Sequence, residues 1–439
     1  MRSDAADTDV VIVGGGFSGT MMAAQLCARG LRVTLIEGGG RAGQGTAYST
    51  RDGVHLLNVP AEKMSAWPDR PGDFVAAGHE AGAFAPRRDY GLYLRDILDR
   101  ALADGVALIE AKAISAVRDG EWRVALDDGR TVTARALVLA QGNQSPEPMR
   151  VGAGIDGARF VNNPWGQEAR AAIERAARDD GAVLIMGTGL TMIDLVLSLD
   201  AAGHRGRIVA LSRRGQVPRS HAPHEAAPVA SDDVPQGNVV AVWRWLRQRS
   251  ATVGWHGAVD ALRPHAQALW QGLSEREQRR FLRHARPYWD VHRHRIAPQV
   301  AGQLEQMIGD GRLEVVAGRI TEMRHEGGGL LVSYSRRSKP SELPRKQEGS
   351  FDVVFNCTGP LGAMGRTCDP LLRQLIDGGM VAVDRLRMGL AVDGDSLAGE
   401  RVWALGPLTK GVFWEIVAVP DIREQVAQVA DHIAKELQA

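Results

Sequence analysis

The sequence predicts an α/β fold with two Rossmann-like domains, the second inserted into the first, and an additional helical insertion. Three observations carry this prediction. A short apolar strand runs into a glycine-rich turn at residues 9–19, and the same arrangement returns at 182–189. Three further apolar runs end on glycine, at Gly142, Gly359 and Gly406. Parallel α/β sheets bind their ligands where strands end in this way.

The first unit begins with the β-branched run Val10–Val13, as expected of a buried parallel strand. Gly14, Gly16 and Gly19 follow in the G-x-G-x-x-G spacing, and a helix is expected to open at about Ser18. The helix N-terminus would offer N–H groups to a pyrophosphate. We therefore expect a dinucleotide to be held by Gly14, Gly15, Gly16, Phe17, Ser18 and Gly19.

A carboxylate at the end of the next strand supports this assignment. Gly30 ends the helix, Leu31–Ile36 reads as a second strand, and Glu37 stands 23 residues after Gly14. At this spacing an acidic side chain typically binds the hydroxyls of a ribose. The alternative is an ordinary βαβ unit with a glycine turn and no ligand.

The region after Glu37 contains a shaped loop, a helix and several strands. Prolines at 60, 68 and 71 argue against a long helix near residues 55–69. Apolar spacing predicts a helix over 90–102. Short strands are expected at 106–109, 113–118, 122–126 and 131–134, and at 136–140, which runs into Gly142.

The second unit starts at strand 182–186 and continues with Gly187 and Gly189. Met192 occupies the place of the third glycine, where a larger side chain would hold the helix away from the strand. We expect Gly187 and Gly189 to bind a second dinucleotide. The next strand is expected at 207–211.

The end of that strand indicates which dinucleotide is bound. The chain reads Ser212-Arg213-Arg214 where an NAD site would place an acidic residue. Two guanidinium groups and a hydroxyl suit the 2′-phosphate of NADP. The alternative is a basic surface loop.

Residues 239–311 read as helical and are rich in Trp, His and Arg. We expect most of these aromatic residues to form the core of a helical insertion, although the run Tyr288–Arg295 could line a substrate pocket. His292 and His294 are two positions apart and do not share a helix face, so no metal site is expected.

The last third returns to strands, expected at 313–316 and 330–334 with an exposed loop at 335–350, and ends with a helix over 421–437. Strands that end at Gly359 and Gly406 complete the pattern. We therefore expect a first domain over 1–175, an inserted domain over 176–350, and the remainder of the first domain over 351–439.

The composition fits a water-soluble protein that binds small molecules. Hydrophobic residues make up 44%, charged residues 24%, and the net charge is +1, which supports neither nucleic acid nor a membrane as a partner. No apolar run approaches the roughly 20 residues that cross a bilayer, and the polar N-terminus does not read as a signal peptide. Cys27, Cys357 and Cys368 form no C-x-x-C pair. A cytoplasmic location is expected, and the oligomeric state stays open.

The motifs resemble those of bacterial FAD/NAD(P)-binding proteins, a family related to two-dinucleotide-binding-domain flavoproteins of the flavin-containing monooxygenase type. The resemblance rests on five segments: Gly14–Thr20, His55–Pro60, Gly187–Asp194, Trp289–Arg295 and Ala418–Arg423. It implies FAD in the first domain and NADPH in the second. Asn58, in Asn58-Val-Pro60, is similar in place to the monooxygenase asparagine that lies between flavin and nicotinamide.

The resemblance implies an FAD-dependent, NADPH-consuming monooxygenase that hydroxylates a small molecule with O2 through a C4a-hydroperoxyflavin. Asn58 would support the oxygenated flavin, although it could instead be a turn-stabilising asparagine. One alternative is a flavin reductase or dehydrogenase with another electron acceptor. Another is a non-catalytic redox sensor that binds FAD and NADP.

Overall fold

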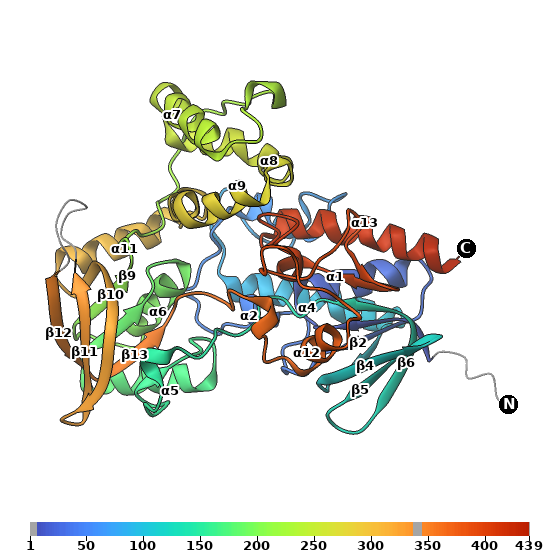
Figure 1. Cartoon of the computed structure of the whole chain (residues 1–439), viewed down its shortest axis with the longest axis horizontal. Coiled ribbons are helices and arrows are strands. Elements are labelled where there is room, and N and C mark those ends of the chain that lie inside the picture. The colour runs from blue at the N-terminus through green and yellow to red at the C-terminus, as the bar shows by residue number, and fades with distance from the viewer. Residues whose placement is uncertain (1–6, 337–344, 439) are drawn as a thin grey trace.

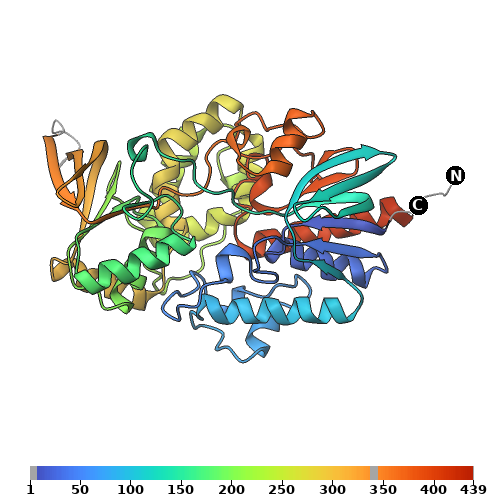
Figure 2. The ribbon, with the colours of Figure 1, turned by 90° about the horizontal axis from the view of Figure 1, so that it is seen from below.

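Two sheets form two lobes of the molecule. The computed structural model describes residues 7–336 and 345–438. Figure 1 shows the lobes side by side, with the helices α7, α8 and α9 above them. In Figure 2 both chain ends lie on the lobe of the first sheet, while the middle of the chain builds the other lobe. The second unit is therefore inserted into the first, as predicted.

The first sheet has the order β14-β15-β6-β1-β2-β3, and the hairpin strands β5 and β4 continue from β6. β1 lies between β2 and β6 and is parallel to both. Its residues Val10–Ile12 are fully buried, as their β-branched run predicts. The strands are β1 Thr8–Val13, β2 Val33–Ile36, β3 Ala107–Ile109, β4 Ala113–Asp119, β5 Glu121–Leu126, β6 Thr131–Leu139, β14 Leu397–Gly399 and β15 Val402–Ala404.

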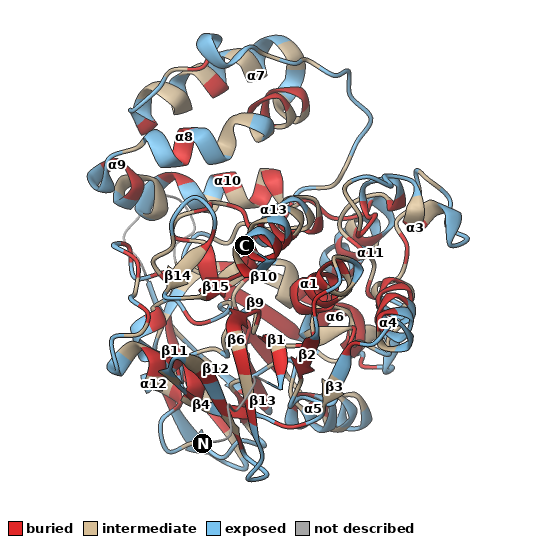
Figure 3. Ribbon diagram, turned by 90° about the vertical axis from the view of Figure 1, so that its right-hand side faces the viewer, coloured by how far each residue is buried: buried red, intermediate tan, exposed pale blue. Residues whose placement is uncertain are grey.

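Helices cover both faces of this sheet. On one face α1, α4 and α13 share a core to which Met21, Leu94 and Ile433 contribute. On the other face α12 packs with the hairpin strands through Leu371 and Trp122. Figure 3 shows β1, β2 and β6 coloured as buried beneath these helices. The helices are α1 Phe17–Ala28, α2 Gly45–Tyr48, α3 Asp73–Ala76, α4 Arg87–Ala103, α12 Pro370–Asp377 and α13 Val419–Gln438.

The second sheet has the order β12-β11-β10-β9-β8-β13-β7. β10, β9, β8, β13 and β7 are parallel, whereas β11 and β12 add antiparallel strands at one edge. One face is covered by α5 Gln167–Asp179, α6 Leu190–Ala201 and α11 Pro298–Gly309. The strands are β7 Phe160–Val161, β8 Val183–Met186, β9 Ile208–Ser212, β10 Leu313–Glu326, β11 Gly329–Arg336, β12 Arg345–Phe351 and β13 Val353–Asn356.

Strand pairing moves both expected domain boundaries. β7 and β13 pair in the second sheet, and α5 packs on that sheet too. The second unit therefore begins before residue 160, not at 176, and it ends after β13, not at 350. The reason is that a parallel strand can join its sheet from a distant part of the sequence, which local patterns do not reveal.

The helical insertion is shorter than the expected 239–311. Its helices are α7 Val239–Leu262, α8 Ala266–Gly272, α9 Glu275–Arg280 and α10 Arg286–Arg293. Trp270 and Trp289 are buried in it, which confirms that its aromatic residues form a core. α11, in contrast, packs on the second sheet through Val300 and Leu304. It is the crossover helix that brings the chain from β9 to the parallel strand β10.

The expected loop 335–350 is wrong in part. β11 extends to Arg336, and residues 345–351 form the edge strand β12, which pairs only with β11 among the described strands. Residues 337–344 of that expected loop lie outside the described residues. The segment Arg345-Lys-Gln-Glu-Gly-Ser-Phe351 is polar because an edge strand keeps most of its side chains in solvent. The polar sequence of this segment is the reason that its strand was not predicted.

Short helical turns complete the chain. The segment around residues 55–69 forms no long helix, as its prolines predict. The 3₁₀ turns span Ala61–Lys63, Arg150–Gly152, Ser231–Asp233, Arg263–His265, Met364–Arg366 and Gly406–Thr409, and Phe281–Ala285 is a π-helical turn.

Candidate dinucleotide-binding sites and the cleft between them

The first glycine turn has the geometry that its spacing predicts. Gly14 has φ +106°, and a Cβ on it would lie 2.5 Å from the carbonyl oxygen of Ala140, at the end of β6. A Cβ on Gly19 would lie 1.8 Å from the Gly14 carbonyl oxygen. Only glycine fits either position, because the turn and α1 approach the backbone too closely for a side chain.

Gly16 caps α1 without a side-chain hydrogen bond, so the N–H groups of the first helical turn remain for a ligand. A Cβ on Gly16 would lie 3.5 Å from Cα of Gly45, in ordinary contact, with no other described atom within 4 Å. The space in front of Gly16 is therefore open, as a pyrophosphate requires. The side chain of Phe17 is buried in the core, so Phe17 can offer a ligand only its backbone.

Glu37 lies beside this turn. Its Oε2 accepts a hydrogen bond of 2.6 Å from the Gly15 N–H, and its Oε1 accepts one of 2.6 Å from the Gly39 N–H. The carboxylate thus sits at the end of β2 and next to the glycine turn, where it could accept bonds from the hydroxyls of an adenosine ribose. Gly43 donates to the Gly15 carbonyl, so the loop after Glu37 flanks the same site.

The end of β15 approaches α1. A Cβ on Gly406 would lie 2.9 Å from the Ser18 hydroxyl oxygen, and Ser18 is buried. The Gly406 N–H donates to Gln425 Oε1 at 2.8 Å, which fixes this segment to α13. Sequence reasoning missed Gln425. Gly142 follows β6, and a Cβ on it would meet no described atom within 4 Å. The structure therefore brings the glycine turn, Glu37 and Gly406 to one edge of the first sheet.

The second glycine turn repeats the first. Gly187 has φ +108°, and a Cβ on it would lie 2.2 Å from the carbonyl oxygen of Cys357, at the end of β13. Gly189 caps α6 without a side-chain bond, and a Cβ on it would meet no described atom within 4 Å. Met192 is fully buried in the core beneath α6. Gly359 follows β13, so it belongs to this second unit and not to the first.

The three residues that end β9 differ in their surroundings. The Ser212 and Thr188 hydroxyl groups lie 2.8 Å apart, and Ser212 accepts a bond of 3.0 Å from the Gly215 N–H. Arg213 and Arg214 are exposed, and neither forms an ion pair with any residue that the structure describes. The Arg214 guanidinium lies 5.2 Å from the centre of the Tyr288 ring. Two unpaired cations therefore stand at the position that distinguishes NADP from NAD. Sequence reasoning missed Thr188.

Asn58 lies between the two units. It lines a small cavity together with Leu57 from the first unit and with Leu190 and Ile193 from α6. Its carbonyl oxygen accepts a hydrogen bond of 2.9 Å from His221 Nε2. Burial lowers the pKa of His221 and so favours the neutral ring, although this hydrogen bond acts in the opposite direction. The side-chain amide of Asn58 forms no hydrogen bond with the described residues. It is therefore not holding a turn.

Buried polar contacts join the units near Asn58. Arg87 Nη1 and Asp194 Oδ2 form an ion pair of 2.7 Å, with both side chains largely buried. His55 Nε2 lies 2.9 Å from the Ser198 hydroxyl, which donates to Asp52 at 3.0 Å. Sequence reasoning missed these residues, because nothing local shows that residues 52–87 face α6.

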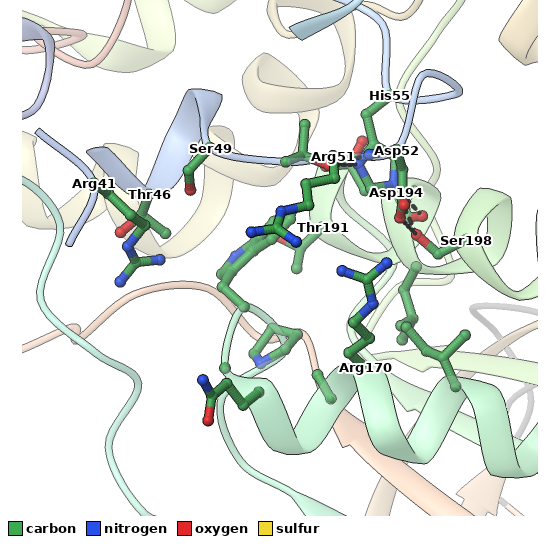
Figure 4. A pocket seen from close by; sticks show the side chains of 18 residues that line it. Arg41, Thr46, Ser49, Arg51, Asp52, His55, Arg170, Thr191, Asp194 and Ser198 are labelled. Atoms are coloured by element: carbon green, nitrogen blue, oxygen red, sulfur yellow. Dashed lines mark hydrogen bonds between the residues drawn. The ribbon is translucent and has the colours of Figure 1, made fainter. Parts of the chain in front are cut away.

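A cleft of about 930 Å³, including its open mouth, lies on the other side of these contacts. Its walls are the segment 41–55 of the first unit and the helices α5 and α6 of the second. Figure 4 shows the guanidinium groups of Arg51 and Arg170 turned into the open space, with Arg41 at its other end. The cleft is therefore basic.

The helical insertion is joined to the C-terminal segment by a buried ion pair. Arg293 Nε and Glu415 Oε2 lie 2.7 Å apart, and Trp289 Nε1 donates to Glu415 Oε1 at 2.5 Å. Burial opposes ionisation of Glu415, but Arg293 outweighs it and holds the pKa of Glu415 below its ordinary value. Trp289 also lines an apolar cavity with Trp243, Trp270 and Trp414. Within the run Tyr288–Arg295, Trp289 therefore lines an apolar cavity, whereas Arg293 forms the ion pair that joins the insertion to the C-terminal segment.

The donors at both turns fit dinucleotides. Each turn offers an uncapped helix N-terminus and an open space at the capping glycine, which suits a pyrophosphate. Glu37 would hold the ribose of FAD in the first unit, while Arg213 and Arg214 would hold the 2′-phosphate of NADPH in the second.

Neither a metal-binding cluster nor a membrane-spanning helix is found among the described residues. Among residues 7–336 and 345–438, no three His, Cys, Asp or Glu side chains gather as a metal site would require. None of the helices in this part of the chain is both long enough and apolar enough to span a bilayer.

The first unit and the fold have counterparts among known proteins. Residues 11–144 match a family model described as FAD-NAD(P)-binding. A rifampicin monooxygenase from Streptomyces venezuelae is 27% identical over 171 residues, which are 34% of this chain and 35% of that protein. The match thus spans about a third of the relative's length.

Solved structures share the fold over the whole chain. An ornithine N-hydroxylase from Kutzneria sp. 744, solved with reduced FAD, NADP⁺ and L-ornithine, superposes with a TM-score of 0.65 at 16% identity, covering 98% of this chain and 99% of that one. A thioredoxin reductase from T. acidophilum superposes with a TM-score of 0.55 at 12% identity, covering 99% and 100%. Residues 11–144 therefore form an FAD-NAD(P)-binding domain, within a chain that has the two-dinucleotide-binding-domain flavoprotein fold.

Proposed function

We propose that this protein is an FAD-dependent, NADPH-consuming monooxygenase that transfers one oxygen atom of O2 to a small molecule. The observation that carries the proposal is the position of Asn58. Its side-chain amide forms no hydrogen bond with the residues that the structure describes, and Asn58 lines a cavity shared by the first unit and α6. An amide placed there can contact both cofactors at once. The rifampicin monooxygenase and the ornithine N-hydroxylase are consistent with this class of reaction.

The residues of this chain bind, orient and shield the reactants. The turn at Gly14–Gly19 would hold FAD, and the turn at Gly187–Gly189 would hold NADPH. When bound, FAD accepts a hydride from NADPH and passes the electrons to O2. The overall change balances as substrate, O2, NADPH and a proton giving hydroxylated substrate, water and NADP⁺. Asn58 would donate a hydrogen bond in a site from which the surrounding apolar side chains exclude water.

The main alternative is an oxidoreductase that passes electrons to another acceptor. A disulfide reductase is disfavoured, because it needs two neighbouring cysteines at the flavin. Cys27 lies on α1 and Cys357 at the end of β13, burial raises the pKa of both thiols, and the three cysteines are all unpaired. Unpaired cysteines also suit the reducing cytoplasm, where we place the protein. A non-catalytic sensor remains the second alternative.

The test compares Asn58→Ala with the wild type. FAD content and NADPH-driven flavin reduction should be retained, while hydrogen peroxide should replace hydroxylated product. The loss of one hydrogen bond in a dry site costs about 1–3 kcal/mol, which is roughly 5- to 150-fold in the lifetime of the species that it stabilises. Stopped-flow absorbance after reduced protein is mixed with O2 measures that lifetime. The ratio of hydrogen peroxide formed to NADPH consumed gives the fraction of turnovers that end in peroxide and not in hydroxylated product.

Asn238→Ala is the matched control. Asn238 caps α7, where its side chain accepts a bond from the Ala241 N–H, so its loss should lower stability without changing the peroxide ratio. If Asn58→Ala behaved like this control, Asn58 would be structural. If the wild type consumed no oxygen with any amine, thioether, ketone or purine, the reductase would be favoured. If the protein never oxidised NADPH, the non-catalytic sensor would be favoured.

A further inference from the structure

The cleft in Figure 4 contains more positive charge than the protein itself neutralises. Arg41 and Arg51 form no ion pair with any residue that the structure describes. Arg170 has only Glu174, whose Oε1 lies 3.5 Å from its Nε, and both side chains are more than half exposed. An exposed pair of this kind contributes little. Three guanidinium groups therefore face the cleft and remain available to a ligand.

The carboxylates of the cleft balance only part of this positive charge. Asp194 forms the 2.7 Å ion pair with Arg87, which lines the cavity of Asn58 and not the cleft. Asp52 accepts the hydrogen bond of the Ser198 hydroxyl. His55 is bonded at both ring nitrogens, to Thr50 and Ser198. One carboxylate, that of Asp52, therefore stands against the three guanidinium groups, and the cleft keeps an excess of positive charge.

The neutral part of the lining also suits an anion. The N-terminus of α5, a helix of 13 residues, opens on the cleft at Gly166 and has no side-chain cap. Its first N–H groups and its dipole favour negative charge. The hydroxyl groups of Thr46, Ser49 and Thr191 line the same space and can donate further hydrogen bonds.

The cleft lies beside the phosphate sites of the two cofactors, and its Arg41 and Thr46 come from the loop that flanks the first glycine turn. Arg213 and Arg214 follow β9 and do not line it, nor do the glycine turns at Gly14–Gly16 and Gly187–Gly189. Thr191 lies in the first turn of α6, directly after the second glycine turn, so the cleft adjoins the place where NADPH would lie. A substrate held there would be next to both nucleotides.

We propose that this cleft binds the acid group of the substrate, a carboxylate or a phosphate ester, through Arg51 and Arg170 with Arg41 in support. The proposal rests on the proposed function, since it names the class of substrate. Guanidinium groups form paired hydrogen bonds with both kinds of acid. The location between the units also means that the ligand would contact both of them.

The experiment measures binding to the FAD-loaded full chain by isothermal titration calorimetry, with no turnover. The probes are succinate and glutarate as carboxylates, glycerol 3-phosphate and inorganic phosphate as phosphates, and NADP⁺. At least one acid should bind saturably, and more weakly as salt is added. Arg51→Ala and Arg170→Ala should each weaken the binding of that acid about tenfold. The double variant should weaken its binding by up to about 100-fold, as expected for the loss of charge-assisted contacts. NADP⁺ affinity and FAD content should not change.

Arg178→Ala is the control, because Arg178 is an exposed arginine in the last turn of the same helix and far from the cleft entrance at Gly166. It should bind every probe as the wild type does. Which probe binds separates a carboxylate substrate from a phosphate ester. The proposal is overturned if no acid binds saturably, if Arg178→Ala matches Arg51→Ala, or if the cleft variants lose NADP⁺ or FAD instead. Because no turnover is involved, these results are independent of the oxygen chemistry tested at Asn58.

Discussion

The two glycine turns share one backbone but serve different ligands. Gly14 and Gly187 have φ of +106° and +108°, and each presses against the carbonyl group that ends a neighbouring strand. Gly16 and Gly189 both cap their helices with ψ −165°. The turn geometry therefore follows from the first two glycines alone, because Met192 stands in the second unit where Gly19 stands in the first.

The differences lie around this shared backbone. In the first unit Glu37 accepts from the N–H of Gly15, whereas in the second Thr188 replaces Gly15 and bonds to Ser212. The strand after the turn thus ends in a carboxylate in one unit and in two unpaired arginines in the other. We therefore expect the turn to bind a pyrophosphate in both units, and the end of the next strand to distinguish a ribose hydroxyl from a 2′-phosphate.

The largest effect is expected from the third position of each turn. Gly19→Ala should abolish FAD binding and soluble expression, because its Cβ would lie 1.8 Å from the Gly14 carbonyl oxygen. Met192→Ala should only destabilise the protein, by about 2–5 kcal/mol, through the cavity it leaves. Thermal denaturation and the flavin absorbance of purified protein measure both. Gly302→Ala, in α11 with open space around it, is the control and should be neutral or slightly stabilising. A yellow, stable Gly19→Ala protein would contradict this account of the turn.

The capping glycines should separate the two cofactors. Gly16→Val should yield protein without FAD, since the added methyl groups occupy the space of the pyrophosphate. Gly189→Val should stay yellow and lose NADP⁺ binding by more than about 100-fold. The protein around Gly189 has room for the side chain, so the loss should fall on the ligand. Flavin content and NADP⁺ titration are the measurements. Full flavin occupancy in Gly16→Val would reject the assignment of FAD to the first unit.

Cofactor preference should depend on the end of β9. Replacing both Arg213 and Arg214 with alanine should weaken NADPH binding by roughly 10- to 100-fold, because a charge-assisted contact contributes about 1.5–3 kcal/mol. NADH should change little. Steady-state KM values for the two cofactors provide the test, with Arg219→Ala, further along the same loop, as the control. Equal losses for NADPH and NADH would show that these arginines do not read the 2′-phosphate.

The smallest effect concerns the link from the second unit to Asn58. His221 has its pKa lowered by burial, so the unfolded chain binds a proton more readily than the folded one. Its contribution to stability should be complete above the ordinary pKa of about 6.5 and should decline as pH falls below that value. His221→Gln should therefore cost about 1 kcal/mol near pH 7.5 and less near pH 5.5. Urea unfolding at several pH values checks this, and a cost that grew in acid would exclude the neutral ring.

Local sequence predicted the parts of the fold that local physics determines. The glycine turns, the buried strands beside them, Glu37 and the arginines after β9 each follow from short-range spacing. The domain boundaries did not, because β7 and β13 reach the second sheet through pairing with strands distant in the sequence. The edge strand β12 was missed for another reason, because its side chains are polar. The helix α11 was assigned to the insertion because its own sequence does not show that it packs on the second sheet.

The site between the units was the least predictable part. Asn58 was identified only through a family resemblance, and its free amide became visible only in the structure. Arg51, Arg170 and the uncapped start of α5 carry no motif, and they come together because two separate folding units meet. Thr188, Gln425 and Arg87 were missed because their hydrogen-bond partners lie 19 to 107 positions away. An interface between inserted domains has no signature in either segment alone.

The return of the chain to its first sheet has a consequence for biosynthesis. The first sheet lacks a strand until β15 has been translated, because β15 pairs with β6. Its cover lacks a helix until α13 has been translated, because α13 packs against α1. The second sheet can close earlier, as soon as β13 has left the ribosome. Until β15 has been translated, residues 137–139 of β6 have an open edge, and open edges invite pairing with other chains. We therefore expect the nascent chain to rely on chaperones at this stage, and FAD to enter only after translation has ended.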